Sequence, residues 1–203
     1  MNYSSDVAFT PAVKAVQELK GSRASYARQE QAGSWKTHVT PDLKIFIEAQ
    51  TSVFLATANA QGQPYIQHRG GPPGFLRVLD AATLGFVDFL GNRQYITLGN
   101  LAENPKAHLF LIDYADRKRV KVWGEARVVE DDTSLTTRLM PRGYKARPSQ
   151  VILFNVLAWD ANCPQHIPQR LEAADVATAL AERDRRIVEL EARVALLSAA
   201  GGQ

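Results

Sequence analysis

Seven segments with the pattern of β-strands follow one another closely between residues 52 and 159. Each is rich in β-branched and aromatic residues and is bounded by turn-forming residues. They are SVFLATAN from residue 52, PYIQHR from 64, FLRVL from 75, TLGFVDF from 83, AHLFLIDY from 107, RVKVWGEARVVE from 119 and QVILFNVLAW from 150. A doubly wound sheet needs a full crossover helix after each strand, and these connections are too short. We therefore expect an α+β protein, mainly β, built on an antiparallel barrel with short helices.

Helix-forming segments lie on both sides of the strands. Thr10-Pro11 and Thr40-Pro41 each place a capping threonine before a proline, which predicts helices beginning at residues 11 and 41. The polar residues 22–34 predict a loop or a loosely packed arm. Further helices are expected over residues 92–104 and 132–140, and a long one over residues 171–198, where strong helix formers run without Gly or Pro.

These segments predict three parts. Residues 1–40 are expected to form an N-terminal helix and arm, residues 41–170 the barrel, and residues 171–203 a C-terminal helix. In the last part Leu180, Ile187, Leu190, Val194 and Leu197 lie near heptad core spacing, and Arg183 interrupts one core position. An isolated helix of this length is marginally stable, so its apolar side should pack on another surface. Self-pairing as a short coiled coil and packing on the barrel of a partner subunit both remain open.

The composition limits which binding partners and which cell compartment we expect for the chain. The net charge is only +3, and the densest basic cluster, residues 116–121, covers a single hairpin, so we expect no nucleic-acid partner. No apolar run reaches the roughly 20 residues of a membrane helix, and the N-terminal residues lack the pattern of a signal peptide. Cys163 is the only cysteine, which favours a reducing cytoplasm. Cys163 and His166 are too few ligands for a metal site, so no metal is expected.

The stretch DFLGNRQY, residues 88–95, follows a predicted strand and opens a predicted helix. A helix N-terminus offers unpaired N–H groups, and Arg93 adds a guanidinium, so the junction suits a phosphate group. Arg77 on the preceding strand could face the same group. The alternative is that Asn92 only caps a helix while Arg93 and Arg77 are solvated surface residues. Spacing alone leaves both interpretations open.

From residue 53 to about residue 170 the chain resembles the pyridoxamine 5'-phosphate oxidase-like FMN-binding split-barrel family. The resemblance rests on ordered stretches that include HRGGPPGF, GNRQYIT, NLAENP and WDANCPQHIP. These are most similar to a subgroup described as predicted flavin-nucleotide-binding proteins. The resemblance implies a split barrel that binds FMN. Gln94 stands where the family often has Lys, which lowers the positive charge of the implied phosphate site.

The resemblance also implies residues for the cofactor. The basic strand residue that meets the FMN phosphate corresponds to Arg77, and the phosphate-binding junction corresponds to Asn92, Arg93 and Gln94. The full set of implied cofactor-binding residues is His68, Arg69, Phe75, Leu76, Arg77, Asp88, Asn92, Arg93, Gln94, Lys121 and Trp159. Lys121, or else Arg119, would reach the flavin of a partner subunit. No catalytic residue is identified.

The resemblance implies a homodimer, because the family's members are dimers that build each flavin site between two subunits. It also implies an FMN-dependent oxidoreductase that acts on an unidentified small molecule. Two other functions stay open from the sequence. One is a flavin-binding redox sensor or store without turnover, and the other is a split barrel that binds a different planar cofactor, such as haem or a deazaflavin.

Overall fold

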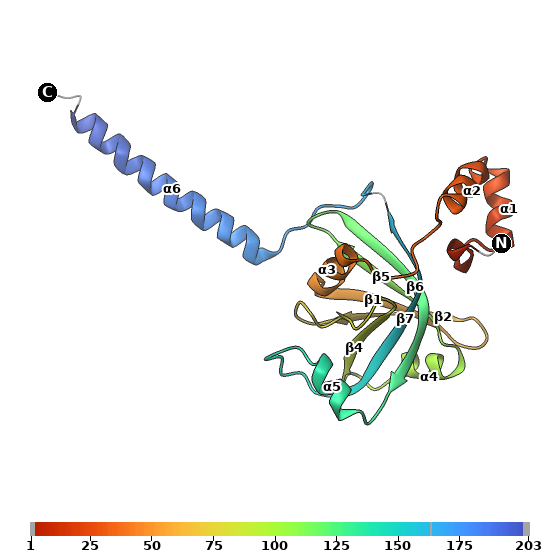
Figure 1. Cartoon of the computed structure of the whole chain (residues 1–203). Coiled ribbons are helices and arrows are strands. Elements are labelled where there is room, and N and C mark those ends of the chain that lie inside the picture. Colours follow the sequence, from red (N-terminus) through yellow and green to blue (C-terminus); the bar gives the residue numbers. More distant parts are fainter. Residues whose placement is uncertain (1–2, 163, 201–203) are drawn as a thin grey trace. The chain divides into compact units, whose positions relative to one another are not determined.

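The computed structural model describes residues 3–162 and 164–200, so the interpretations that involve Cys163 lie outside the described residues. The described residues form seven strands and six α-helices (Figure 1). In chain order these are a short 3-10 helix η1 (Ser4–Val7), α1 (Pro11–Leu19), α2 (Arg23–Gln31), α3 (Pro41–Ala49), β1 (Ser52–Ala58), β2 (Pro64–Gly70), β3 (Arg77–Val78), β4 (Thr83–Phe89), α4 (Ile96–Glu103), β5 (Lys106–Asp113), β6 (Lys118–Val129), α5 (Thr133–Leu139), β7 (Pro148–Asn162) and α6 (Ala173–Ala200).

All seven strands belong to one sheet in the order β2-β1-β5-β6-β7-β4-β3. Every pair of neighbours is antiparallel. Within the described chain no backbone pairing joins β2 to β4 or β3, so the sheet is not closed by hydrogen bonds. The predicted fold class, α+β and mainly β with an antiparallel split barrel, is confirmed, and the split lies between β2 and the β4–β3 pair.

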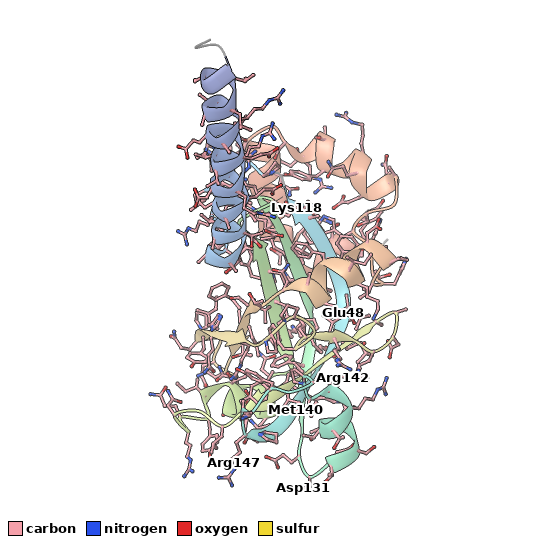
Figure 2. All side chains as sticks on the ribbon, turned by 90° about the vertical axis from the view of Figure 1, so that its left-hand side faces the viewer. Glu48, Lys118, Asp131, Met140, Arg142 and Arg147 are labelled. Carbon is pink, nitrogen blue, oxygen red and sulfur yellow. The ribbon has the colours of Figure 1, made fainter. Side chains whose placement is uncertain are left out.

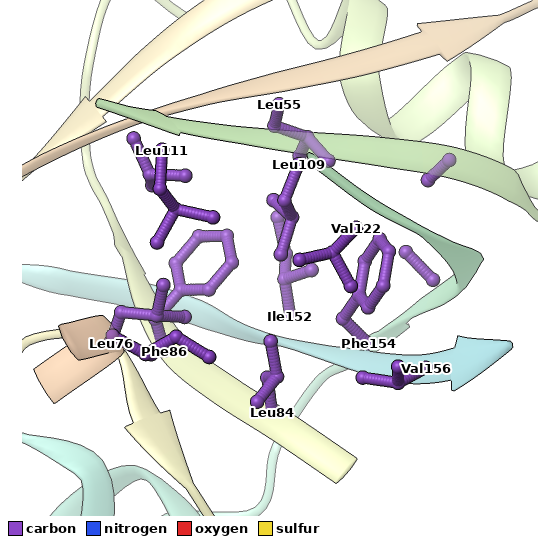
Figure 3. Close-up of a cluster of buried hydrophobic side chains, with 14 of the residues drawn as sticks. Leu55, Leu76, Leu84, Phe86, Leu109, Leu111, Val122, Ile152, Phe154 and Val156 are labelled. Carbon is purple, nitrogen blue, oxygen red and sulfur yellow. The ribbon is translucent and has the colours of Figure 1, made fainter. Parts of the chain in front are cut away.

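The core consists of side chains that alternate along the strands toward one face. In β1 every second residue is buried, as a strand with one face against a core requires. Figure 3 shows how residues from five strands and the segment before β3 converge: Leu55, Leu76, Leu84, Phe86, Leu109, Leu111, Val122, Ile152, Phe154 and Val156. Each large apolar side chain buried in this way contributes about 1.5–3 kcal/mol. The core therefore supplies the rigid frame on which the strand ends are held.

Both threonine caps form as expected. Thr10 Oγ1 accepts a hydrogen bond of 3.3 Å from Val13 N, and Thr40 Oγ1 accepts one of 3.3 Å from Leu43 N. The short helix expected over residues 132–140 is α5, which begins after an Asp132 cap. The long C-terminal helix expected from residue 171 is α6.

Three local predictions were wrong. Residues 23–31 form α2 rather than a loop, because Arg, Gln and Glu are good helix formers and Arg23 forms an ion pair with the buried Glu30. The helix expected from residue 92 begins only at Ile96, after two residues with positive φ. The strand expected over 75–79 is reduced to β3, because Phe75 N donates to Pro72 O in a turn.

The N-terminal helices are joined to the barrel by aromatic contacts. Trp35 stacks on Trp123 of β6 with ring centroids 4.5 Å apart, and the Phe9 ring contacts Trp35 with centroids 5.0 Å apart. A hydrogen bond also ties α3 to the edge strand β3. Glu48 of α3, labelled in Figure 2, accepts this hydrogen bond of 3.1 Å from Val78 N.

The chain divides into two compact units. One comprises the chain up to Asp113 together with Lys118–Pro164, and the other comprises Tyr114–Arg117 and the chain from Gln165 onward, which includes α6. In the second unit the Arg170 guanidinium stacks on the Tyr114 ring at 4.6 Å. Across the described residues, no helix combines the length and the apolar character that crossing a membrane would require.

Candidate functional site

A hollow of about 50 Å³ lies where β4 ends and α4 begins. Three pieces of the barrel line it: β2, the whole segment from Asp88 to Leu98, and the start of β7. The lining residues outside that segment are Tyr65, Gln67, Arg69, Ser149 and Gln150. The hollow therefore sits at the split of the barrel, where the edge strand β2 approaches β4.

An ion pair bridges the split. Arg69 Nη1 of β2 lies 2.6 Å from Asp88 Oδ1 of β4, and both side chains are largely buried, with 14% and 5% of their surface exposed. These strands are not neighbours in the sheet, so this contact joins its two sides. Arg69 Nη2 also donates to Thr97 Oγ1 at 3.3 Å, and Thr97 in turn donates to Gln67. Arg69 thus connects β2, β4 and the first turn of α4.

Burial has the largest effect on the pKa of Asp88. It raises the pKa of the Asp88 carboxyl, against the opposing effects of the Arg69 charge and of a hydrogen bond donated by Gln150. Asp88 Oδ1 and Arg69 Nε have no hydrogen bond of normal geometry within the described structure, although the ion pair itself is short. The proton affinity of the Asp88 carboxyl group is therefore greater than that of an ordinary aspartate.

The junction after β4 has an unusual backbone. Arg93 and Tyr95 adopt left-handed φ values of 60° and 55°, which non-glycine residues rarely do. Gln94 N donates to Asn92 Oδ1 at 3.3 Å, so Asn92 stabilises the turn without capping the helix. Tyr95 occupies the N-cap position of α4 and makes no side-chain cap. The N–H groups of the first turn of α4 are therefore available beside the exposed Arg93 side chain.

A second hollow of about 230 Å³ adjoins the first. The two share Arg69 and the segment Asp88–Gly91, and the second adds His68, Gly70, Phe75, Phe86 and Val87. His68 is held by a 2.8 Å hydrogen bond between its Nε2 and Ser52 Oγ and by edge contact with the Phe54 ring. The pair of hollows is polar and basic on the α4 side and more apolar toward the core.

The structure brings seven of the residues implied by the resemblance to these two hollows. They are His68, Arg69, Phe75, Asp88, Asn92, Arg93 and Gln94. Leu76 lies elsewhere, fully buried in the core. Arg77 pairs with Gly85 in the sheet, and its guanidinium donates to the backbone oxygens of Gly74 and Arg138. It lines neither hollow.

Lys121 and Trp159 lie on β6 and β7, in the middle of the sheet order. Lys121 forms an ion pair with Asp160 at 3.1 Å and lies over the Trp123 ring at 5.2 Å. The Trp159 indole donates to His38 O at 2.9 Å. Both side chains are thus engaged with the N-terminal segment and the strands next to it, and neither lines the hollows of its own chain.

Gln67, Thr97 and Gln150 belong to the site although the sequence did not predict them there. Thr97 could have been found as a polar residue in the first turn of a helix, had the start of that helix been placed correctly. Gln150 faces Asp88 in the β4–β7 register, a pairing that no local pattern reveals. Its role depends on topology alone.

Residues 39–163 match the family model described as pyridoxamine 5'-phosphate oxidase, which is more than half of the 203 residues. The chain belongs to this family. The membership expected from the sequence is confirmed, and the match includes both hollows of the split. No curated protein matches the chain.

Solved structures share the family's fold. HupZ of Group A Streptococcus has a TM-score of 0.50 and 19% identity, over 66% of this chain and 99% of that one. An FMN-binding protein from Syntrophomonas wolfei has a TM-score of 0.47 and 11% identity, over 72% and 97%. The heme storage protein HutZ of Vibrio cholerae has a TM-score of 0.43 and 18% identity, over 58% and 89%. At these identities the likeness concerns the fold alone.

Proposed function

We propose that this member of the pyridoxamine 5'-phosphate oxidase family binds FMN, with the phosphate group held at the β4–α4 junction. The observation that carries the proposal is the combination found there: an uncapped helix N-terminus, the exposed Arg93 beside it and the amide of Asn92 in the preceding turn. Free N–H groups and the positive end of the helix dipole favour an anion, and a guanidinium suits phosphate oxygens.

The phosphate end would depend mainly on Arg93. Gln94 is neutral, so Arg93 is the only cationic side chain in the segment from Asp88 to Leu98. Arg69 is basic too, but the Asp88 carboxylate already neutralises it. A charge-assisted hydrogen bond contributes about 1.5–3 kcal/mol. Loss of Arg93 should therefore weaken FMN binding by about 10- to 100-fold.

Space for the flavin ring is incomplete in a single chain. The hollows hold about 50 and 230 Å³, whereas small-molecule pockets usually hold about 300–1,000 Å³. A second copy of the chain placed against the split would add the missing wall. We therefore include a homodimer in the proposal, with one FMN site at each of two symmetric positions. Lys121 and Trp159 can contribute to such a site only from the partner subunit, since they do not line the hollows of their own chain.

The favoured activity is an FMN-dependent oxidoreductase acting on a small molecule. FMN, when bound, supplies the redox chemistry. The residues of this chain would bind and orient it, with Arg93 at the phosphate and the apolar Phe75 side of the second hollow near the ring. Because burial raises the pKa of Asp88, this carboxyl can hold a proton nearer to neutral pH than an ordinary aspartate can. Asp88 is the residue we assign to proton exchange with a substrate.

A flavin store or sensor without turnover is the second candidate. The observation that favours it is that Arg69 and Gln150 already engage the Asp88 carboxylate, which restrains it as an acid or base. Anaerobic mixing of the FMN-loaded protein with reduced nicotinamide separates the two candidates. Bleaching of the flavin within seconds supports an oxidoreductase, and a flavin that stays oxidised supports a store.

Titration of FMN with the purified protein, followed by quenching of flavin fluorescence, tests the binding site. We expect saturable binding by the wild type and affinity about 10- to 100-fold lower for Arg93→Ala. Arg28→Ala, which removes an exposed arginine of α2, is the matched control and should bind like the wild type. Arg77→Ala should lower the affinity less than Arg93→Ala, because Arg77 is bonded to Gly74 and Arg138.

The results of this titration show separately whether FMN is the cofactor and whether its phosphate group binds at the β4–α4 junction. A wild type that leaves flavin fluorescence unchanged, while the same preparation binds haem or a deazaflavin, rejects FMN as the cofactor. Tight FMN binding that Arg93→Ala leaves unchanged accepts the cofactor and rejects the phosphate site.

A further inference from the structure

The second compact unit contains a long helix whose apolar stripe is uncovered. α6 runs for 28 residues, from Ala173 to Ala200. Its apolar stripe follows the a and d positions of a heptad, with Leu180, Ile187 and Val194 at a and Val176, Leu190 and Leu197 at d. These six side chains are between 39% and 65% exposed. A single helix of this kind is marginal in water, so a partner should cover the stripe.

We propose that α6 pairs with α6 of a second copy as a parallel, two-stranded coiled coil. The first support is the choice of core residues. Ile187 and Val194 are β-branched residues at a, and Leu190 and Leu197 stand at d. β-branched residues at a combined with Leu at d favour parallel dimers over trimers and tetramers.

The charges beside the stripe fix the direction. The e positions carry Asp184 and Glu191, and the g positions carry Arg186 and Arg193. In a parallel pair a g residue of one helix faces the e residue of the next heptad on the other helix, which brings Arg186 next to Glu191 on both sides of the coil. An antiparallel pair would place e beside e and g beside g. Acid would then face acid and base would face base.

Arg183 occupies the one charged core position, at d. A polar residue at a single core position lowers the stability of a coiled coil but restricts its register and number of strands. The long side chain can leave the interface and keep its charge in water, next to the acidic e position that follows it. Val188 and Leu196 lie outside the stripe and are not explained by the pairing.

Disulfide cross-linking of the full chain tests the pairing. Cys163 is the only cysteine, so Cys163→Ser gives a background in which single cysteines can be placed on α6. We choose Val176→Cys and Leu197→Cys, both at d and near opposite ends of the helix, and Ala192→Cys at the outward f position as the control. In a parallel coil equivalent d residues face each other within the Cα separation of about 4.4–6.8 Å that a disulfide needs.

We expect each d variant, oxidised alone, to run mainly as a covalent dimer on a non-reducing gel, and Ala192→Cys to stay monomeric. Cross-linking that appears only when Val176→Cys is mixed with Val194→Cys, the a residue that would face it in an antiparallel pair, would show an antiparallel pair and overturn the proposal. Absence of cross-linking in all three samples would also overturn the proposal. The apolar stripe of α6 would then have to be covered by a different protein.

A charge exchange gives a second test that leaves the core residues in place. Arg186→Glu with Arg193→Glu makes every charged e and g position acidic and should abolish most of the cross-linking of Leu197→Cys. Adding Asp184→Arg and Glu191→Arg restores opposite charges and should restore the cross-link. Cross-linking that ignores both changes would contradict the assigned direction. Neither test depends on FMN, so the pairing of α6 and the flavin site can fail independently.

Discussion

Asp88 is buried and His108 is half-buried, and removal from water moves the pKa values of these two residues in opposite senses. Burial disfavours the charged form of each group. It raises the pKa of the Asp88 acid, and together with the nearby Lys121 charge it lowers the pKa of the His108 base to about 4. Asp88 lines the split, whereas His108 stands on β5 with its ring edge against Trp123 at 4.9 Å. The two residues therefore predict opposite effects of pH on stability.

His108 should make the protein less stable in mild acid. Its pKa is about 4 in the folded chain against 6.5 when unfolded, so between these values the unfolded state binds more protons. The stabilising contribution is complete above pH 6.5 and is lost as the pH falls toward 4, by about 2 kcal/mol at pH 5. We expect His108→Phe, which keeps a ring against Trp123, to reduce the loss of stability between pH 7 and pH 5 by about that amount in urea unfolding. An identical loss in wild type and variant would contradict the assignment.

Asp88 should act in the other direction. With a folded pKa above the ordinary value of 3.8, the native state binds more protons, and its stability falls as the pH rises from 3.8 through the folded pKa. Asp88→Asn removes this slope, which is at most about 1.4 kcal/mol per pH unit. The difference in unfolding free energy between variant and wild type should therefore move in favour of the variant as the pH rises from 4. If it moves in favour of the wild type, attraction to Arg69 outweighs burial.

At the scale of single elements, two glycines predict opposite responses to the same substitution. Gly124 lies at the β-bulge between β6 and β7, where an added Cβ would stand 2.1 Å from Asn155 O. Gly99 lies inside α4 with open space where its Cβ would be. Gly124→Ala should destabilise the protein by about 1–3 kcal/mol or more, because the two longest strands must separate. Gly99→Ala should stabilise it by about 0.5–1 kcal/mol.

Urea unfolding of both variants measures this contrast. Destabilisation by Gly99→Ala would show that α4 needs glycine for a reason other than backbone freedom, such as close approach of another chain. Tolerance of Gly124→Ala would show that the bulge is not a fixed feature of the β6–β7 register.

The elements that the sequence predicts best are those with local signals. Thr10 and Thr40 predict the starts of α1 and α3, because each threonine side chain accepts a capping hydrogen bond from the backbone N–H three residues later. The long strands are predicted by the alternation of apolar residues. The start of α4 could not be predicted in this way. Arg93 and Tyr95 carry no sequence signal for positive φ, so the helix begins later than propensity suggests. The segment of α2 has no apolar periodicity, and its helix depends on the Arg23–Glu30 ion pair.

For the whole molecule, family motifs locate the site, whereas topology alone assembles it. The sequence points to Asn92, Arg93 and Asp88 through one continuous stretch. It does not indicate that Gln150 faces Asp88, or that Arg69 reaches across the split, because both contacts join residues about 20 to 60 positions apart. Arg77 shows the converse. Its neighbouring strand suggested a shared anion site, but the register pairs it with Gly85, several residues before the junction.

The central claim is that the β4–α4 junction holds the phosphate group of FMN. Riboflavin carries the same ring without that phosphate, so comparing the two ligands isolates the junction. The most direct measurement is the pair of dissociation constants, for FMN and for riboflavin, of the wild type and of Arg93→Ala. We expect the wild type to prefer FMN by at least about 10-fold and Arg93→Ala to lose most of this preference while binding riboflavin as before. A wild type without preference, or a variant that loses both ligands equally, would contradict it.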